Sequence, residues 1–218
     1  MESAEYLKVR WAARRRLRHE RERWVTGERH VAGLDEAGRG PLAGPVVAAA
    51  VVFPPGEFVE GVRDSKLLTP AEREALFGEI CARAIGVGVG VVDHETIDRI
   101  NILQATFRAM HEAVERLPVR PDHLLVDGNR FLDCGVPFTT VVDGDALSFT
   151  IAAASVVAKV TRDRLMVAYD AEYPLYGFVR HKGYATPEHR RAIAEYGLCP
   201  IHRRSFTLST QIPLPFRG

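Results

Sequence analysis

The sequence has few cysteines and no long apolar segment. Its 218 residues include only three cysteines, Cys81, Cys134 and Cys199, which are far apart and form no C-x-x-C pair. This number and spacing argue against a disulfide framework and against a structural zinc site. No apolar run approaches the roughly 20 residues of a membrane helix, and the charged N-terminus has no apolar signal core. We therefore expect a cytoplasmic protein with no membrane association.

Charge is spread unevenly, although the net charge is only +1. Residues 1–30 carry nine Lys or Arg and five Asp or Glu, residues 173–218 carry seven and two, and the middle carries 13 and 21. An acidic centre with basic ends suits a protein that holds cations with carboxylates and also binds a polyanion. Charge runs are usually solvated surfaces, and for this pattern taken alone that interpretation is the favoured one.

Apolar patterns alternate between strand and helix types, which indicates one α/β domain. Strands are expected at Val31–Asp35, Val46–Phe53, Ile85–Val92, His123–Asp127 and Phe138–Val142. Helices are expected from the Thr69 cap to about Ala84, as a short and a longer helix within Asp93–Leu117, over about Leu147–Glu172 and over about Pro187–Tyr196. Two hairpin-type strands followed by helix-separated strands predict a mixed sheet with helices against it.

The first 30 residues form a basic extension ahead of the domain, which we expect to cover residues 31–218. Val9, Ala13, Leu17 and Trp24 fall on one helical face, so the extension is expected to be an amphipathic helix. Its arginines would contact nucleic acid, or the helix would pack on the domain, and the sequence leaves both interpretations open.

Two adjacent carboxylates, Asp35 and Glu36, lead directly into a glycine-rich stretch that contains Arg39. Because side chains alternate along a strand, both acids point the same way only if the strand ends there, so the pair predicts a strand tip. The glycines allow a polyanionic ligand to approach main-chain N–H groups. On these residues alone, however, an ordinary polar turn is the favoured interpretation.

Acids also stand at the ends of two later strands, Asp127 before Gly128 and Asp145 after Gly144. Each one alone is more often a turn former, and Asp143 competes with Asp145 for the same role. Carboxylates without cysteine or histidine partners favour hard divalent cations such as Mg²⁺. Two such ions would activate a water and stabilise the leaving oxygen of a phosphodiester. Three acidic strand ends in one domain therefore favour metal-assisted hydrolysis.

Several motifs resemble, in the same order, those of bacterial ribonuclease HII. They are Gly33–Pro45, Asp64-Ser65-Lys66, Val126-Asp127-Gly128, Gly144-Asp145, Ala152–Asp163 and His181-Lys182-Gly183-Tyr184, and the match extends from Val31 to about Phe206. The resemblance implies a ribonuclease H-like fold, in which helices flank a central mixed β-sheet and the C-terminal part is helical.

The same resemblance implies the site residues and the cofactor. The acids that bind metal would be Asp35, Glu36, Asp127 and Asp145, with Mg²⁺ or Mn²⁺ in a two-metal mechanism. The Gly38, Arg39 and Gly40 element would contact the ribose, whose 2′-hydroxyl alone distinguishes RNA from DNA at one sugar. Tyr184 would pack on the next deoxyribose and sense the RNA-to-DNA junction. Lys66 would assist binding of the substrate phosphates.

The implied activity is endonucleolytic cleavage of the RNA strand of RNA–DNA hybrids and incision 5′ of single ribonucleotides in duplex DNA. The products would carry 5′-phosphate and 3′-hydroxyl ends, and the roles would be ribonucleotide removal from DNA and RNA primer processing. We expect a monomer whose partners are these nucleic acids. The C-terminal Gln211–Phe216 segment has the composition of an extended ligand, so contact with a sliding clamp is a further hypothesis.

Two alternatives and one minor assignment accompany this interpretation. A related nuclease such as ribonuclease HIII is less favoured, because the Gly38-Arg39-Gly40 element is present and the large N-terminal domain expected of ribonuclease HIII is not. A non-catalytic nucleic-acid-binding module would be expected to lack one of the four acids, and all are present. Arg162, Asp163 and Arg164 are expected to form local pairs on a helix surface.

Overall fold

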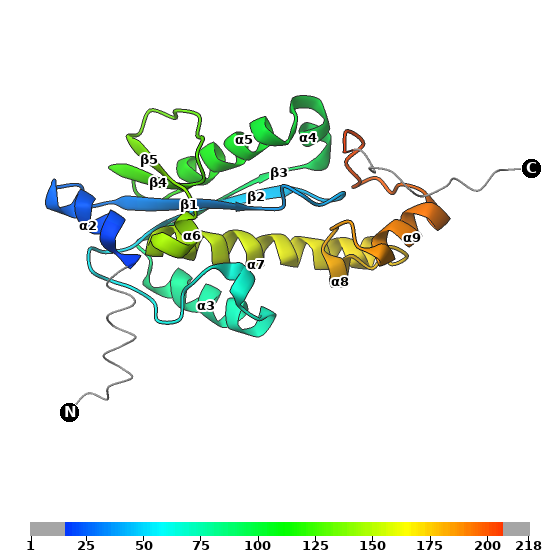
Figure 1. Ribbon diagram of the computed structural model, residues 1–218, viewed down its shortest axis with the longest axis horizontal. Helices are drawn as coiled ribbons and strands as arrows, with labels where there is room; N and C mark the ends of the chain where they lie inside the picture. Colours follow the sequence, from blue (N-terminus) through cyan, green and yellow to red (C-terminus); the bar gives the residue numbers. More distant parts are fainter. Residues whose placement is uncertain (1–15, 207–218) are drawn as a thin grey trace, which may run out of the picture.

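A computed structural model of the chain describes residues 16–206 and places a mixed five-stranded sheet at the centre (Figure 1). The strands are β1 (Val31–Ala37), β2 (Val46–Val52), β3 (Gly86–Val92), β4 (His123–Asp127) and β5 (Phe138–Val141), and their order across the sheet is β3-β2-β1-β4-β5. The pairs β1–β2 and β2–β3 are antiparallel, whereas β1–β4 and β4–β5 are parallel. The predicted mixed sheet is confirmed.

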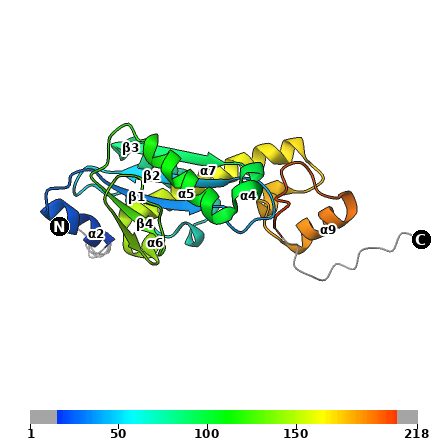
Figure 2. The ribbon, with the colours of Figure 1, turned by 90° about the horizontal axis from the view of Figure 1, so that it is seen from above.

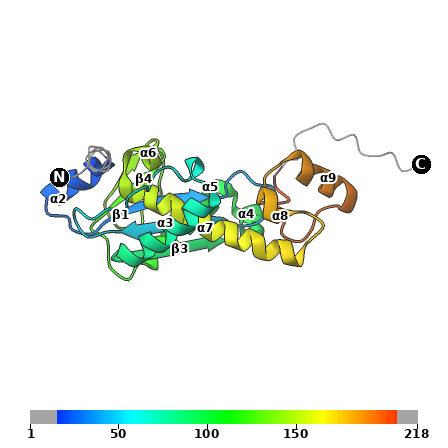
Figure 3. The ribbon, with the colours of Figure 1, turned by 90° about the horizontal axis from the view of Figure 1, so that it is seen from below.

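Helices cover both faces of the sheet. Helices α4 (His94–Ile100) and α5 (Ile102–Glu115) lie over one face (Figure 2), and α3 (Pro70–Arg83) and α7 (Phe149–Glu172) lie over the other (Figure 3). Because side chains alternate along a strand, β2 packs against the helices on both faces of the sheet. Its Ala48 and Ala50 pack in the cluster with α5, and Ala49 and Val51 pack in the cluster with α7. Every residue of β2 is buried.

The helix α7 extends beyond the sheet and carries the C-terminal part of the chain, with α8 (Phe178–His181) and α9 (Pro187–Tyr196) (Figure 1). A separate apolar cluster forms there, in which Met166 of α7 packs with Phe178 and Ile193. Leu42 and Ala43, from the loop that follows β1, belong to the same cluster. The expected helical C-terminal part is therefore confirmed, and the loop after β1 is fixed against it.

Local signals in the sequence predicted most element boundaries. Thr69 and Glu72 form the reciprocal capping box at the start of α3. Asn101, with a φ of 67°, separates α4 from α5 and caps α5. The glycines of β3 permit close packing, since a Cβ at Gly90 would lie 1.9 Å from the carbonyl oxygen of Ala109 in α5.

Two boundaries differ from prediction, and two short helices were not predicted. The strand β1 continues to Ala37, because its pairing with β2 extends to Ala37 opposite Val47. The expected helix at Leu147 begins instead at Phe149, where Ser148 accepts a hydrogen bond from the Ile151 N–H as the cap. A short helix α6 (Gly144–Leu147) precedes it, and the one-turn helix η1 (Ser65–Leu67) precedes α3.

The described part of the N-terminal extension contains helix α2 (Arg18–Val25), which packs on the domain. Leu17 is buried in the core, and Trp24 lies against it. Glu20 is fully buried and accepts hydrogen bonds from the Thr150 N–H at 2.9 Å and from the Ser148 hydroxyl at 2.7 Å. A carboxylate at the N-terminus of α7 is stabilised by the helix dipole.

Two parts of the earlier expectations fall outside the described residues. The positions Val9 and Ala13 of the predicted amphipathic helix precede residue 16, and the Gln211–Phe216 segment follows residue 206. Within residues 16–206, no helix has the length and apolar character needed to cross a membrane.

Candidate active site

The parallel register of β1 and β4 places Asp35 beside Asp127. The paired residues run from Val31 opposite His123 to Leu34 opposite Val126, so Asp35 and Asp127 are the next residues at the same level of the sheet. The side chains of adjacent residues on neighbouring strands point to the same face. Asp35 and Asp127 therefore converge, although they are more than ninety positions apart in the sequence.

Asp35 lies inside the strand rather than at the predicted tip, with 6% of its surface exposed. Its carboxylate accepts a hydrogen bond from the Glu36 N–H at 2.7 Å, and Ser155 of α7 lies near enough to stabilise the charged form. Ser155 is in turn 2.8 Å from the Ser65 hydroxyl. Burial, together with repulsion from Glu36 and Asp127, raises the pKa of Asp35 well above its usual value.

Glu36 lies at the same strand end, beside the glycine-rich stretch. Burial raises the pKa of Glu36, and the guanidinium of Arg39, 3.2 Å from its carboxylate, opposes that shift. Burial likewise raises the pKa of Asp127, although the Gly144 N–H donates to its carboxylate at 2.7 Å. For three of the four predicted acids, Asp35, Glu36 and Asp127, the surroundings therefore stabilise the negative charge less well than water does.

Asp145 stands in α6, next to Asp127, and is 7% exposed. The ammonium of Lys66, at the turn η1, is 3.3 Å from its carboxylate. Burial alone would lower the pKa of Lys66, but its interactions with Asp145, Asp64 and Asp35 together outweigh burial, so that pKa lies above its usual value. Asp143 is exposed and adopts a left-handed backbone conformation at the start of α6. This geometry favours Asp145 over Asp143 as the functional acid.

The four acids provide an all-oxygen donor set, which fits a hard divalent cation. Repulsion from neighbouring acids helps to raise the pKa of Asp35, Glu36 and Asp127, and the cations beside them are Lys66 and Arg39. Within residues 16–206, no three His, Cys, Asp or Glu side chains already stand as they would around a metal ion. The carboxylate oxygens of the four acids are therefore suitable ligands for a divalent metal ion. To bind one, the four side chains must move closer to one another.

The glycine-rich loop (residues 38–45) follows β1 and meets Tyr184. Arg39 and Gly40 are exposed, and a Cβ at Gly40 would lie 3.9 Å from the Tyr184 ring. Tyr184 itself is 43% exposed. The structure therefore brings the predicted glycine-arginine-glycine element together with the predicted tyrosine on one accessible surface.

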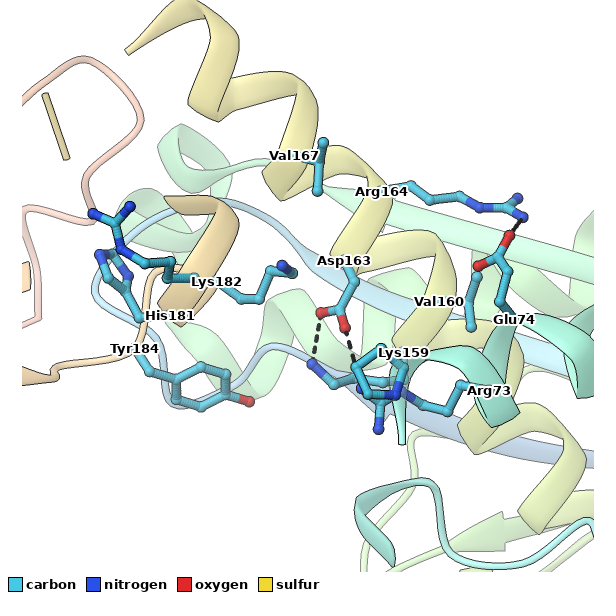
Figure 4. Close-up of a pocket in the computed structure, with 12 residues that line it drawn as sticks. Arg73, Glu74, Lys159, Val160, Asp163, Arg164, Val167, His181, Lys182 and Tyr184 are labelled. Carbon is cyan, nitrogen blue, oxygen red and sulfur yellow. Dashed lines mark hydrogen bonds and ion pairs between the residues drawn. The ribbon is translucent and has the colours of Figure 1, made fainter. Parts of the chain in front are cut away.

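A basic pocket of about 550 Å³ lies beside Tyr184, between α3, α7 and α8 (Figure 4). Its charged lining comprises the cations Arg73, Lys159, Arg164, Arg180 and Lys182 and the acids Glu74 and Asp163. Asp163 pairs with Lys159 at 2.6 Å and with Arg73 at 3.8 Å. Arg73 also donates to the carbonyl of Ser65 at 3.0 Å, which connects the pocket to the turn that carries Lys66.

Known proteins share both the sequence and the fold. A family model described as Ribonuclease HII matches residues 32–209. The Ribonuclease HII of Geobacter metallireducens is 60% identical over 176 residues, which cover 81% of this chain and 83% of that protein. This chain belongs to the ribonuclease HII family.

Solved structures of ribonuclease HII relatives share the architecture. The ribonuclease H2 of Pyrococcus horikoshii OT3 is 30% identical, with a TM-score of 0.70 over 81% of this chain and 93% of that one. A chain of the PCNA:RNase HII complex from Archaeoglobus fulgidus is 26% identical, with a TM-score of 0.71 over 84% of this chain and 98% of that one. The expected ribonuclease H-like fold is confirmed, and the protein is an endoribonuclease, a type 2 ribonuclease H acting on RNA–DNA hybrids.

One prediction within the ribonuclease HII motifs was wrong. Arg162 was expected to pair on a helix surface, yet it is fully buried. The spacing along α7 indicates this burial, because Arg162 lies on the same helical face as the buried residues Ala154, Ala158 and Met166, at intervals of four residues. Arg203, which is 2% exposed, has no comparable signal in the sequence, since its contacts come from distant parts of the chain.

Proposed function

We propose that this enzyme incises duplex DNA 5′ of a single embedded ribonucleotide, in addition to cleaving the RNA strand of hybrids, and that it requires Mg²⁺ or Mn²⁺. The observation that carries the proposal is the placement of two features on one surface. Asp35, Glu36 and Asp127 lie on the neighbouring strands β1 and β4, and Asp145 lies beside Asp127 in α6. The loop that leaves β1 passes close to Tyr184, where a Cβ at Gly40 would lie 3.9 Å from the ring.

The metal ligands in this proposal are Asp35, Glu36, Asp127 and Asp145. A divalent cation bound there supplies activation of water and stabilisation of the charge that develops on the leaving oxygen. The protein contributes a buried end of the sheet, where the Gly144 N–H donates to the carboxylate of Asp127 and Ser155 stabilises the charged form of Asp35. Lys66, which pairs with Asp145, would move to a substrate phosphate as a cation takes its place.

Recognition of the ribose is assigned to the exposed main chain of Arg39 and Gly40. A glycine at position 40 leaves room for a sugar between the loop and the Tyr184 ring, where a larger side chain would intrude. Tyr184 would pack on the deoxyribose that follows the ribonucleotide, so that a second 2′-hydroxyl would interfere. This arrangement would require an RNA-to-DNA junction rather than any RNA.

The basic pocket is assigned to the sugar-phosphate backbone. It continues the accessible surface from Tyr184 along α7, and its lining has five cations against two acids. Lys182 stands on the α8 side, and Arg73 and Lys159 stand opposite (Figure 4). Arg180 of α8 also lines the pocket. Backbone phosphates are the ligands that such a lining favours, because each cation replaces a counterion.

Incision by this route would serve the removal of ribonucleotides from DNA and the processing of RNA primers. The test is an end-labelled DNA duplex with one ribonucleotide, compared with the same duplex made entirely of DNA, in Mg²⁺, in Mn²⁺ and in excess chelator. We expect incision only of the ribonucleotide duplex and only with metal. Equal cutting of both duplexes, or full activity in chelator, would refute the proposal.

Junction recognition is tested separately by replacing Tyr184 with alanine. We expect kcat/KM on the single-ribonucleotide duplex to fall at least roughly tenfold more than on a uniform hybrid, because the ring contact with the deoxyribose is lost and a tenfold change corresponds to about 1.4 kcal/mol. Tyr196→Ala is the matched control, since Tyr196 is similarly exposed, at 47%, on α9. An unchanged preference in the Tyr184 variant would remove this residue from the recognition surface.

Contact with a sliding clamp through residues 207–218 is a second, separate proposal. It is supported by the composition of Gln211–Phe216 and by a relative of the family being known in a complex with PCNA. Deleting residues 207–218 should abolish co-elution with the host's clamp and leave hydrolysis of a short hybrid unchanged. Co-elution of the truncated protein would refute it.

A further inference from the structure

Two buried arginines without carboxylate partners lie beneath the glycine-rich loop. Arg162 of α7 has no exposed surface, and Arg203, after α9, is 2% exposed. Neither guanidinium has a carboxylate within 4.0 Å among residues 16–206, and both donate to main-chain carbonyl groups instead. Burying an unpaired charge is costly, so this arrangement calls for an explanation beyond packing.

Arg203 fixes both ends of the glycine-rich loop. Its guanidinium donates to the carbonyls of Gly38 at 2.6 Å, Arg39 at 3.0 Å and Gly44 at 2.9 Å. In a planar trans peptide, the N–H of the next residue points opposite to the carbonyl. The N–H groups of Arg39 and Gly40 therefore point away from Arg203, and neither donates to an acceptor within the described chain. Arg203 thus presents two free donors at the surface.

Arg162 joins the second half of the loop to the segment of Tyr184. It donates to the carbonyls of Ala43 at 3.1 Å and Pro45 at 2.9 Å, and to that of Lys182 at 3.0 Å. Its guanidinium carbon lies 5.8 Å from the centre of the Tyr184 ring. The Leu42 N–H also donates to the Gly183 carbonyl at 2.8 Å. One side chain therefore ties both recognition elements together.

The space beneath the loop is matched to these arginines. A Cβ at Gly38 would lie 2.1 Å from Nε of Arg162, and the φ of Gly38 is 98°, a conformation that favours glycine. Glycine at this position is thus required by the buried guanidinium as well as by the turn. Burial lowers the pKa of Arg162, and burial together with repulsion from Arg162 lowers that of Arg203 to about 9. The two cations are close neighbours, and main-chain carbonyl groups accept hydrogen bonds from both.

We infer that Arg162 and Arg203 are positioning residues for ribonucleotide recognition, which together hold the N–H groups of Arg39 and Gly40 at a fixed place relative to the Tyr184 ring. The inference rests on the proposed function, because it concerns how that surface distinguishes a ribonucleotide next to DNA. Each of the two guanidinium groups donates three hydrogen bonds, in directions that its planar geometry fixes. A lysine keeps the charge and the length but loses this geometry.

The test compares Arg203→Lys and Arg162→Lys with the wild type on two substrates, a DNA duplex with one ribonucleotide and a uniform RNA–DNA hybrid. The readout is kcat/KM on the single-ribonucleotide duplex divided by kcat/KM on the uniform hybrid. This ratio does not depend on how much of the variant is folded, because the same active enzyme acts on both substrates. We expect each variant to lower this ratio at least tenfold and to shift it in the same direction as Tyr184→Ala. Arg116→Lys, which changes an arginine bonded to the Val89 carbonyl on the α5 side, should leave the ratio unchanged.

Loss of both activities in parallel, partial or complete, would overturn the inference and leave the two arginines with a role in folding alone. The proposed function is judged first and separately, on the wild type. A wild-type enzyme that does not incise at the ribonucleotide refutes that function, and the inference with it. A wild-type enzyme that does so, with variants of unchanged ratio, refutes only the inference.

Discussion

At the scale of single residues, the candidate site was largely predictable, and its supports were not. Asp35, Asp127 and Asp145 follow apolar strand patterns, and acids at adjoining parallel strand ends meet at one edge of the sheet. Arg162 and Arg203 could not be assigned this way. Their partners are main-chain carbonyl groups, which carry no side-chain identity, so no residue pattern specifies them.

The assignment of Asp127 as a metal ligand predicts the behaviour of one isosteric variant. Asp127→Asn should lower kcat by at least roughly 100-fold, because an amide places a cation less firmly than a carboxylate does. Affinity for a hybrid, measured by fluorescence anisotropy without metal, should change less than about twofold, since the basic surface is intact. Asp143→Asn, at an exposed position close by, is the matched control and should retain kcat. Near wild-type kcat for Asp127→Asn at saturating metal would remove Asp127 from the ligand set.

At the scale of elements, the C-terminal part is held by neutral histidines. His189 Nδ1 lies 3.0 Å from the Tyr184 carbonyl, so it must donate, and its Nε2 then accepts from Nε2 of His202, also at 3.0 Å. His202 Nδ1 is left to accept from the Cys199 N–H at 2.9 Å. Each ring is therefore neutral and has one defined tautomer. No spacing in the sequence predicts these hydrogen bonds, because they connect α9 with the segment that follows it.

Protonation of these histidines should weaken the fold as the pH falls. Burial lowers the pKa of His189 from 6.5 to about 4, and burial also lowers that of His202. Between pH 6.5 and about 4, His189 binds a proton in the unfolded chain but not in the native state. The free energy of unfolding therefore decreases as the pH falls through this range. One linked proton corresponds to about 1.4 kcal/mol per pH unit.

Urea unfolding of the wild type and of His189→Gln at several pH values measures this linkage. The variant should be less stable at neutral pH, because it loses two hydrogen bonds, and its stability should decline less steeply on acidification. An equal slope in the two proteins would show that His189 is not the group that titrates.

At the scale of the whole molecule, the alternation of strand and helix patterns predicted the fold class, but the strand order required the structure. The contact between β1 and β4 brings together residues about ninety positions apart, which no local pattern specifies. The uneven charge is explained at this scale too. The acidic middle supplies the carboxylates of the site, and the basic C-terminal part contributes Arg180 and Lys182 to the pocket beside it.

The basic pocket predicts how binding depends on salt. Lys182→Gln should reduce the slope of log affinity against log salt concentration by about 0.9, since one phosphate contact is lost. The measurement is anisotropy of a labelled hybrid duplex without divalent metal, between about 50 and 200 mM KCl. Arg108→Gln removes the same charge from α5, across the sheet, and should leave the slope unchanged. Equal slopes for both variants would contradict a phosphate contact at this pocket.

The most direct measurement of the central claim is the position and chemistry of the cut in a DNA duplex with one ribonucleotide. With Mg²⁺, we expect a single incision 5′ of the ribonucleotide. The fragment that begins with the ribonucleotide should carry a 5′-phosphate, and the upstream fragment a 3′-hydroxyl. These ends follow if water, rather than the neighbouring 2′-oxygen, attacks the phosphorus. A 2′,3′-cyclic phosphate, or a cut on the 3′ side of the ribonucleotide, would contradict it.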